Sequence, residues 1–235
     1  MSNSNHMLDT NIVLSVVLPN EYSEDLTKNY LKVNFIRYIS NTSCEESNKK
    51  ISDIKLLSFS ISEFVKCYSL ENNVNFLKLN KVISEIKKLF LANYNNYLPI
   101  NVTENRFEGM VTDFFKSYDD ELKSILINCE NEDFNKLIRK SLKKYKIKLN
   151  IFLGNFKCIT IQSYEQDVDN LKKIGLDNLD AILLSEASNL QLTLNSQVNF
   201  ITYDKNILSL KNQIFKSLSQ SVIVSSPMEF VSVNN

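Results

Sequence analysis

The first third of the chain alternates between apolar runs and segments with helical spacing. Residues 12–18 are an apolar run that predicts the continuation of a short first strand into a helix. Apolar residues recur at helical spacing from 21 to about 40, and the polar run over 41–50 predicts a loop. A second apolar run, IKLLSFSI at 54–61, predicts a buried strand, and Ser62 is placed to be the N-cap of the next helix.

The last third of the chain shows the same alternation more clearly. Strands are predicted at 156–162, 198–204 and 221–226, and helices at 163–175, 179–194 and 206–218. Gly175 is placed to end the first of these helices, because glycine adopts the positive φ that helix ends require. Strands that alternate with helices predict an α/β fold with a parallel sheet.

Residues 75–149 have a different texture, with many charged residues and apolar residues at helical spacing. The stretch NNYLPINVT at 95–103 predicts a break between helices. A chain of 235 residues is long enough to bury the core of one large domain. We predict a single domain over 1–235 that carries a helical insertion over 75–149.

Composition excludes several classes of protein. The chain is 43% hydrophobic and 23% charged, which is typical of a globular protein, and its 27 basic and 27 acidic residues cancel. Attraction to nucleic acid must therefore be local. No signal peptide is visible, and no apolar run reaches the roughly 20 residues that span a bilayer. We expect a cytoplasmic protein without membrane association.

The cysteines give no sign of a metal site. Cys44, Cys67, Cys129 and Cys158 are far apart in the sequence, and His6 is the one histidine. A zinc site is not expected from this spacing. We interpret the four cysteines as reduced thiols.

Acidic residues follow three of the predicted strands. Asp9 follows the first strand, Glu63 the strand at 54–61, and Asp204 the strand that contains Phe200. The carboxyl ends of parallel strands lie at one edge of the sheet, where ligands bind. Asp180 opens the helix before the Asp204 strand, and a helix start can lie at that same edge. We expect these four carboxylates to converge.

Four carboxylates in one cleft repel one another strongly. Two unit charges 4 Å apart cost about 4 kcal/mol at an effective dielectric constant near 20. Protonation or a divalent cation can offset this repulsion. Oxygen ligands without histidine or cysteine favour Mg²⁺ or Mn²⁺, ions that suit the cleavage of phosphodiester bonds.

Each acid also has a structural interpretation. Asp9 could be a turn residue, and Glu63 could stabilise the first turn of a helix through the helix dipole. Asp177 could be the N-cap of a helix in which Asp180 occupies the N3 position. Asp204 could cap the next helix in the same way. Whether Asp177 joins the acidic cluster stays open.

The four acids and their flanking residues resemble the PIN-domain nucleases. The chain opens with an apolar stretch around D-T-N at 9–11, and SFSISEFVKCY carries Glu63 at the start of a helix. LDAILLSEASNL places Asp180 at the start of an apolar helix, and FITYD ends a strand with Thr202 and Asp204. The ending VIVSSPMEFV is also similar to the last strand and tail of the family.

The resemblance implies a three-layer α/β/α sandwich with a central parallel sheet, and Mg²⁺- or Mn²⁺-dependent cleavage of RNA. It implies that the metal is held by Asp9, Glu63, Asp180 and Asp204. Asn11 and Thr202 would orient the carboxylates or the attacking water. Many small members are toxins that an antitoxin protein neutralises, but the long insertion departs from those small toxins.

A basic segment lies within the insertion. IRKSLKKYKIKLN at 138–150 includes Lys140, Lys143 and Lys144, which we predict to contact the phosphates of a substrate. The alternative is the solvated face of an amphipathic helix.

The sequence thus predicts a metal-dependent endoribonuclease, with RNA as substrate and an antitoxin or other regulatory protein as a partner. One alternative is a PIN-like module that binds RNA or protein without catalysis, and another is a nuclease that acts on DNA. The sequence separates neither RNA from DNA nor a monomer from a homodimer.

Overall fold

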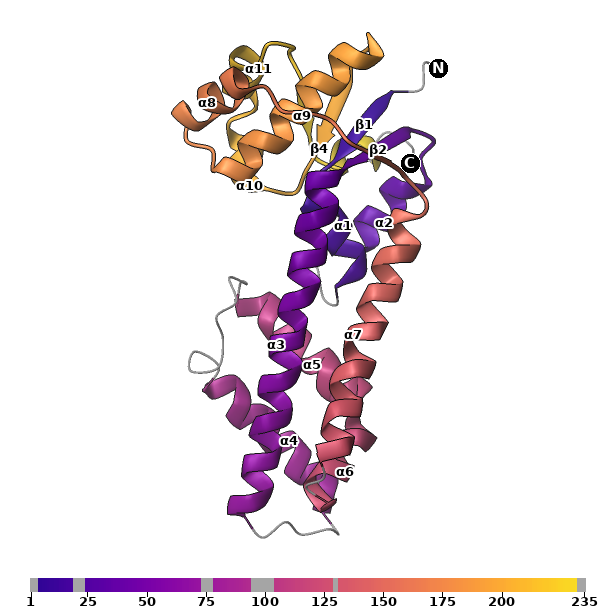
Figure 1. Ribbon diagram of the computed structural model, residues 1–235, viewed down its shortest axis with the longest axis vertical. Coiled ribbons are helices and arrows are strands. Elements are labelled where there is room, and N and C mark those ends of the chain that lie inside the picture. The colour runs from indigo at the N-terminus through magenta and orange to yellow at the C-terminus, as the bar shows by residue number, and fades with distance from the viewer. Residues whose placement is uncertain (1–3, 19–23, 73–77, 94–103, 129–130, 232–235) are drawn as a thin grey trace. The chain divides into compact units, whose positions relative to one another are not determined.

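The computed structural model describes residues 4–18, 24–72, 78–93, 104–128 and 131–231. The chain divides into two compact units (Figure 1). The α/β unit is built from residues 1–17, 21–47 and 149–235, and the helical unit from residues 18–20 and 48–148. The dividing points at 47/48 and 148/149 fall inside two long helices.

Strands and helices alternate through most of the α/β unit. Its strands are β1 (Asn5–Leu8), β2 (Ile36–Ser40), β3 (Lys157–Ile159), β4 (Val198–Ile201) and β5 (Ile223–Ser225). Its helices are α1 (Thr10–Val17), α2 (Glu24–Lys32), α8 (Glu165–Lys173), α9 (Asn178–Leu194), α10 (Lys205–Ser209), α11 (Lys211–Ser217) and α12 (Met228–Val231). The helical unit contains α4 (Leu79–Ala92), α5 (Glu104–Ser117), α6 (Asp119–Asn128) and most of α3 (Asn41–Glu71) and α7 (Asn131–Leu153).

The described strands form one five-stranded sheet in the order β3-β2-β1-β4-β5. All four pairings are parallel, and Met7 of β1 lies opposite both Tyr38 of β2 and Phe200 of β4. The chain therefore builds the sheet outward from β1 through β2 to β3, and then returns to the other side of β1 for β4 and β5. This confirms the predicted α/β class and its parallel sheet.

Helices cover both faces of the sheet. On one face Met7 and Phe200 pack in a core with residues from α8, α9 and α11, among them Leu171, Leu184 and Ile214. On the other face the buried His6 ring stacks on Phe35 at 4.1 Å and contacts Tyr30 of α2 and Phe230 of α12. The α/β unit is thus a three-layer sandwich, as predicted.

His6 is held as a neutral ring in this second layer. Its Nδ1 forms a hydrogen bond of 2.7 Å with the Tyr30 hydroxyl, and its Nε2 one of 2.9 Å with the Ser4 hydroxyl. Burial, together with the positive charge of Arg37, lowers the pKa of His6 to about 4. The histidine therefore acts as a packing residue of β1.

Two predictions for residues 54–62 are wrong. Residues 54–61, predicted as a strand, lie within α3, and Ser62 is a buried residue of that helix instead of its N-cap. Leu57, Ile61 and Val65 are buried at helical spacing, whereas Leu56 is 47% exposed. A short apolar run cannot be assigned to strand or helix from its periodicity alone.

The second strand lies earlier in the chain than predicted. Residues 36–40, IRYIS, form β2, although Ile36 and Ile39 also fit the helical spacing on which the prediction was based. The predicted loop at 41–50 is the start of α3. The predictions of a helix up to about residue 40 and of a loop at 41–50 are therefore both wrong.

Predictions for the last third of the chain agree better with the structure. Gly175 follows α8 with a φ of +100°, as its predicted role requires. The helix predicted at 206–218 is divided at Leu210 into α10 and α11, and the tail after Pro227 forms the short α12.

The described part of the predicted insertion is helical and adds no strand to the sheet. Apolar side chains from each helix of the helical unit are buried, among them Ile61, Phe90, Phe114, Ile125 and Leu137. The predicted break at 95–103 lies outside the described residues. None of the described helices combines the length and the apolar character needed to cross a membrane.

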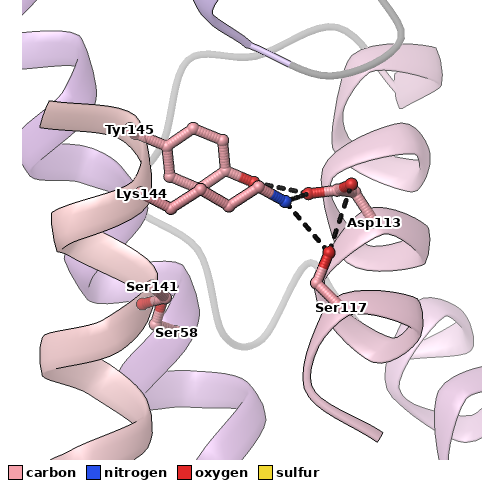
Figure 2. A network of polar contacts seen from close by, with 6 residues as sticks. All are labelled: Ser58, Asp113, Ser117, Ser141, Lys144 and Tyr145. Atoms are coloured by element: carbon pink, nitrogen blue, oxygen red, sulfur yellow. Dashed lines mark hydrogen bonds and ion pairs between the residues drawn. The ribbon is translucent and has the colours of Figure 1, made fainter. Parts of the chain in front are cut away.

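Polar contacts join the helices of this unit (Figure 2). The buried hydroxyls of Ser58 on α3 and Ser141 on α7 lie 2.8 Å apart. Asp113 of α5 accepts hydrogen bonds from Lys144 at 2.8 Å and from the Tyr145 hydroxyl at 2.7 Å. Burial would raise the pKa of Asp113, but these two hydrogen bonds and the charge of Lys144 hold it below its usual value.

We expect Asp113→Asn to lower the free energy of unfolding at pH 7 by about 1–2 kcal/mol, because it weakens two charge-assisted hydrogen bonds between α5 and α7. The difference from wild type should shrink as the pH falls and Asp113 becomes protonated. Asp119→Asn is the matched control, since its partner Lys123 is four residues away on the same helix and such pairs contribute about 0.5 kcal/mol at most. Urea denaturation of both variants measures the effect, and equal losses would contradict it.

Candidate active site

The order in which the chain adds strands to the sheet reverses between β1 and β4, and a ligand site is expected at this point. From β1 the chain adds strands on one side and then on the other, so the crossover connections diverge at this pair. In open parallel sheets, ligands bind at such a switch point, outside the carboxyl ends of the strands. Asp9 directly follows β1 and Thr202 directly follows β4.

Asp9 is buried at this point, with 4% of its surface exposed. Its backbone N–H donates to the Ile201 carbonyl at 3.0 Å and continues the β1–β4 ladder. Its Oδ1 accepts a hydrogen bond of 2.6 Å from the Thr10 N–H, and its Oδ2 accepts bonds of 2.6 Å from both Asn11 Nδ2 and Thr202 Oγ1. These three donors explain how a carboxylate is tolerated in an apolar segment.

Asn11 and Thr202 fix the orientation of this carboxylate. Asn11 Nδ2 also donates to Thr202 Oγ1 at 2.9 Å, and Asn11 Oδ1 accepts a bond of 3.0 Å from the Tyr203 N–H. Thr202 Oγ1 accepts in addition from the Asp204 N–H at 2.9 Å. The two residues predicted to orient the carboxylates thus contact Asp9 and join the ends of β1 and β4.

Two of the other aspartates cap helices. Asp204 Oδ1 accepts from the N–H groups of Asn206 and Ile207 and is the N-cap of α10. Asp177 is the N-cap of α9 and accepts from the N–H groups of Leu179 and Asp180, which places Asp180 at the N3 position. The structural interpretation of Asp177 is therefore correct, and Asp204 serves as a cap through one of its oxygens.

Asp180 is surrounded by negative charge. Burial, together with the charges of Asp177, Asp9, Asp204 and Glu46, raises its pKa to about 7. Burial and the charges of Glu46 and Asp204 likewise raise the pKa of Asp9 to about 7, against the opposing hydrogen bonds from Thr202 and from the Thr10 N–H. Asp9, Asp180 and Asp204 therefore lie near one another, as predicted.

The fourth acid of this group is Glu46 and not the predicted Glu63. Glu63 lies about six turns along α3 and belongs to the helical unit, so it does not follow a strand. Glu46 lies in the second turn of α3, which begins directly after β2, and it is half-buried. We refer to Asp9, Glu46, Asp180 and Asp204 as the carboxylate group.

A fifth acid, which sequence reasoning missed, lies beside the start of α3. Glu186 of α9 is 4% exposed, and its Oε1 accepts a hydrogen bond of 2.5 Å from the Thr42 hydroxyl. Burial raises its pKa against the opposing hydrogen bonds from Thr42 and Ser40. Its Oε2 is buried and has no hydrogen-bond partner among the described residues. Glu186 thereby connects α9 to the end of β2.

The carboxylate group could hold a metal ion only after side-chain movement. Within the described ranges, no three acid, histidine or cysteine side chains are placed to bind one ion together. The hydrogen bonds explain why, since both oxygens of Asp9 accept from protein donors and Asp204 uses one oxygen as a cap. The donor set itself suits Mg²⁺ or Mn²⁺.

A cavity of about 370 Å³ lies elsewhere in the α/β unit. It is lined by residues before and within β2 and β3, including Arg37, Phe156 and Lys157. The carboxylate group is at the opposite, carboxyl ends of the strands. The switch point is the candidate active site because the acids lie there, whereas none of the residues that line the cavity is acidic.

The three lysines predicted to bind substrate lie on α7, in the helical unit. Lys140 forms an ion pair with Glu121, and Lys144 forms one with Asp113. Lys143 is exposed. Two of the three lysines therefore have a structural role within the helical unit.

Comparison of the chain with protein-family models, curated proteins and solved structures finds no match. The function of the site therefore has to be inferred from its own geometry.

We expect the wild-type protein to lose stability between pH 5 and pH 8. The pKa values of Asp9 and Asp180 are raised to about 7, above the value near 3.9 of an unfolded aspartate, so the folded state binds more protons in this window. Since one unit of pKa shift corresponds to about 1.4 kcal/mol, the free energy of unfolding should fall by more than roughly 1 kcal/mol.

Asp180→Asn tests the cause of this fall. The variant should be more stable than wild type at pH 8, because it removes one of the repelling charges, and nearly equal to it at pH 5. Urea denaturation in metal-free buffer at the two pH values measures both proteins. An equal loss of stability in wild type and variant would contradict the assignment.

Proposed function

We propose that the protein is a cytoplasmic endoribonuclease of the PIN type that depends on Mg²⁺ or Mn²⁺. One observation carries the proposal: at the switch point of a parallel sheet, the charges of Glu46 and Asp204 add to burial in raising the pKa of both Asp9 and Asp180. A group of repelling carboxylates lowers the stability of the folded protein. Its presence at a position suited to ligand binding favours a function that uses negative charge.

Asp9, Asp180, Asp204 and Glu46 would hold the metal. Thr202 and Asn11 fix the orientation of Asp9, and their hydrogen bonds to its Oδ2 would have to yield when a cation arrives. A cation would also return the raised pKa values of Asp9 and Asp180 towards normal. When bound, such an ion supplies an activated water and stabilises charge on the phosphate.

Of the three lysines predicted to bind substrate, the exposed Lys143 is best suited to contact a phosphate of the RNA, because Lys140 and Lys144 are in ion pairs. A regulatory protein, such as the antitoxin of a toxin–antitoxin pair, would control the activity. Both statements extend the family resemblance of the sequence.

A second candidate is a PIN-like module that binds RNA or protein without catalysis. It is favoured by the three hydrogen bonds that Asp9 already accepts and by the capping role of Asp204. Under this interpretation the acids stabilise local structure, and no ion is required.

We expect the purified protein to cleave mixed-sequence RNA only when Mn²⁺ or Mg²⁺ is added. Asp180→Asn and Glu46→Gln should each lower the rate more than about 100-fold, because each removes a carboxylate ligand from the site. Glu63→Gln is the matched control and should retain activity, since Glu63 lies far along α3 from its start. The same assay with DNA separates the two nuclease alternatives.

Thermal melting provides an independent readout of the same proposal. Mn²⁺ should raise the melting temperature of wild type and of Glu63→Gln, and should have little effect on Asp180→Asn, because a ligand that binds only the folded state stabilises it. Binding of RNA without metal response or cleavage would support the non-catalytic module instead.

The role of α7 is tested by the salt dependence of RNA binding. Lys143→Ala should weaken binding to single-stranded RNA and reduce the log–log slope by about 0.7, the value of one lost phosphate contact. Lys123→Ala, which removes a lysine paired with Asp119 on α6, controls for the loss of charge. An unchanged slope in Lys143→Ala would assign α7 a purely structural role.

A further inference from the structure

Two cysteines that are 114 residues apart in the chain meet in the α/β unit. Cys44 is the fourth residue of α3, and Cys158 is the central residue of β3. Their sulfur atoms lie 3.7 Å apart, and Cys158 lies opposite Ile39 of β2 in the sheet. This contact is not indicated by their separation in the sequence.

The contact requires only a small movement to become a covalent bond. A disulfide has an S–S distance of about 2.05 Å, so each sulfur would have to move by about 0.8 Å, which a rotation about the side-chain bonds can supply. Cys158 is exposed, so an oxidant can reach it, and Cys44 is half-buried beside it. We propose that Cys44 and Cys158 are a redox pair that closes to an intramolecular disulfide when the protein meets a peroxide.

The reaction divides into two balanced steps. The Cys158 thiolate attacks one oxygen of hydrogen peroxide, the O–O bond breaks, and Cys158 sulfenic acid and hydroxide form. The Cys44 sulfur then attacks the Cys158 sulfur, the S–O bond breaks, and the Cys44 proton leaves with the hydroxyl as water. Two thiols are oxidised by two electrons, and one peroxide is reduced to two waters.

The order of the steps follows from the surroundings of the two thiols. Cys158 is exposed and Cys44 is only half-buried beside it, so a peroxide in solution reaches Cys158 more readily. Once Cys158 is oxidised, Cys44 is already in contact with it at 3.7 Å.

The bond would restrain a turn that carries part of the carboxylate group. Thr42 and Glu46 lie two residues on either side of Cys44. Thr42 holds Glu186, and the charge of Glu46 acts on Asp9 and Asp180. Fixing this turn to β3 would limit the side-chain movement that metal binding requires. This effect on cleavage rests on the proposed function, whereas formation of the disulfide does not.

The test treats the full-length protein with hydrogen peroxide and then alkylates the remaining thiols. Wild type should fall from four alkylatable cysteines to two, and peptide mapping should recover Cys44 linked to Cys158. Dithiothreitol should restore all four. Cys67→Ser should form the same link, because Cys67 lies on another part of α3. Cys44→Ser should form no link and should accumulate sulfinic acid at Cys158 instead.

Three results would overturn the proposal: four thiols that persist in wild type, a link that involves Cys67 or Cys129, or a link between two chains. The effect on the site is measured separately. Oxidised wild type should cleave RNA about tenfold more slowly than reduced wild type, with no such change in Cys158→Ser. Unchanged cleavage after oxidation would overturn the effect on the carboxylate group. Because peptide mapping needs no substrate, it gives the same answer if the protein cleaves nothing.

Discussion

The α/β unit depends on a buried carboxylate at the carboxyl end of its middle strand, β1. Asp9 ends β1, and the hydroxyl of Thr202 at the end of β4 donates directly to it. Asn11 donates to both residues, so one cluster of hydrogen bonds joins β1 and β4, the two strands between which the strand order reverses. If the carboxylate were removed, three donors that the fold has gathered around it would lose their acceptor.

The same carboxylate has an opposing effect on stability. Its burial and the nearby acids disfavour its charged form, while its hydrogen bonds favour that form. Asp180 experiences the repulsion without a comparable set of donors, as the causes of its raised pKa show. Hydrogen bonds thus stabilise the carboxyl ends of the strands at Asp9, while repulsion between acids destabilises them at Asp180, and a bound cation of the kind proposed above would reduce this repulsion.

Sequence reasoning succeeded where polar residues directly followed a clear strand. Asp9 and Asp204 were placed just after the strands that the structure ends at Leu8 and Ile201. Glu46 was missed because Ile36 and Ile39 fit a helical spacing as well as a strand, so the acids after β2 were assigned to a loop. The isoleucines and tyrosine of IRYIS indicate a strand by composition, and that signal would have found it.

Other features could not be predicted from local pattern at all. The contact between Cys44 and Cys158 depends on the pairing of β2 with β3, which no spacing in the sequence encodes. The hydrogen bond between Thr42 in the first turn of α3 and Glu186 of α9 is also not encoded by any spacing in the sequence. The ion pairs of Lys140 and Lys144 likewise follow from helix packing, whereas the sequence displayed only a cluster of positive charge.

The position of the helical unit in the chain has a consequence for the order of folding. Neighbouring strands β2 and β3 are separated by more than a hundred residues, so their pairing requires closure of a long loop. Once the helical unit has folded, the contact between Ser58 and Ser141 shortens the free chain between the strands to about thirty residues. That shortening lowers the entropic cost of closure by about 1 kcal/mol. If the helical unit folds first, the shorter loop would therefore speed the pairing of β2 with β3.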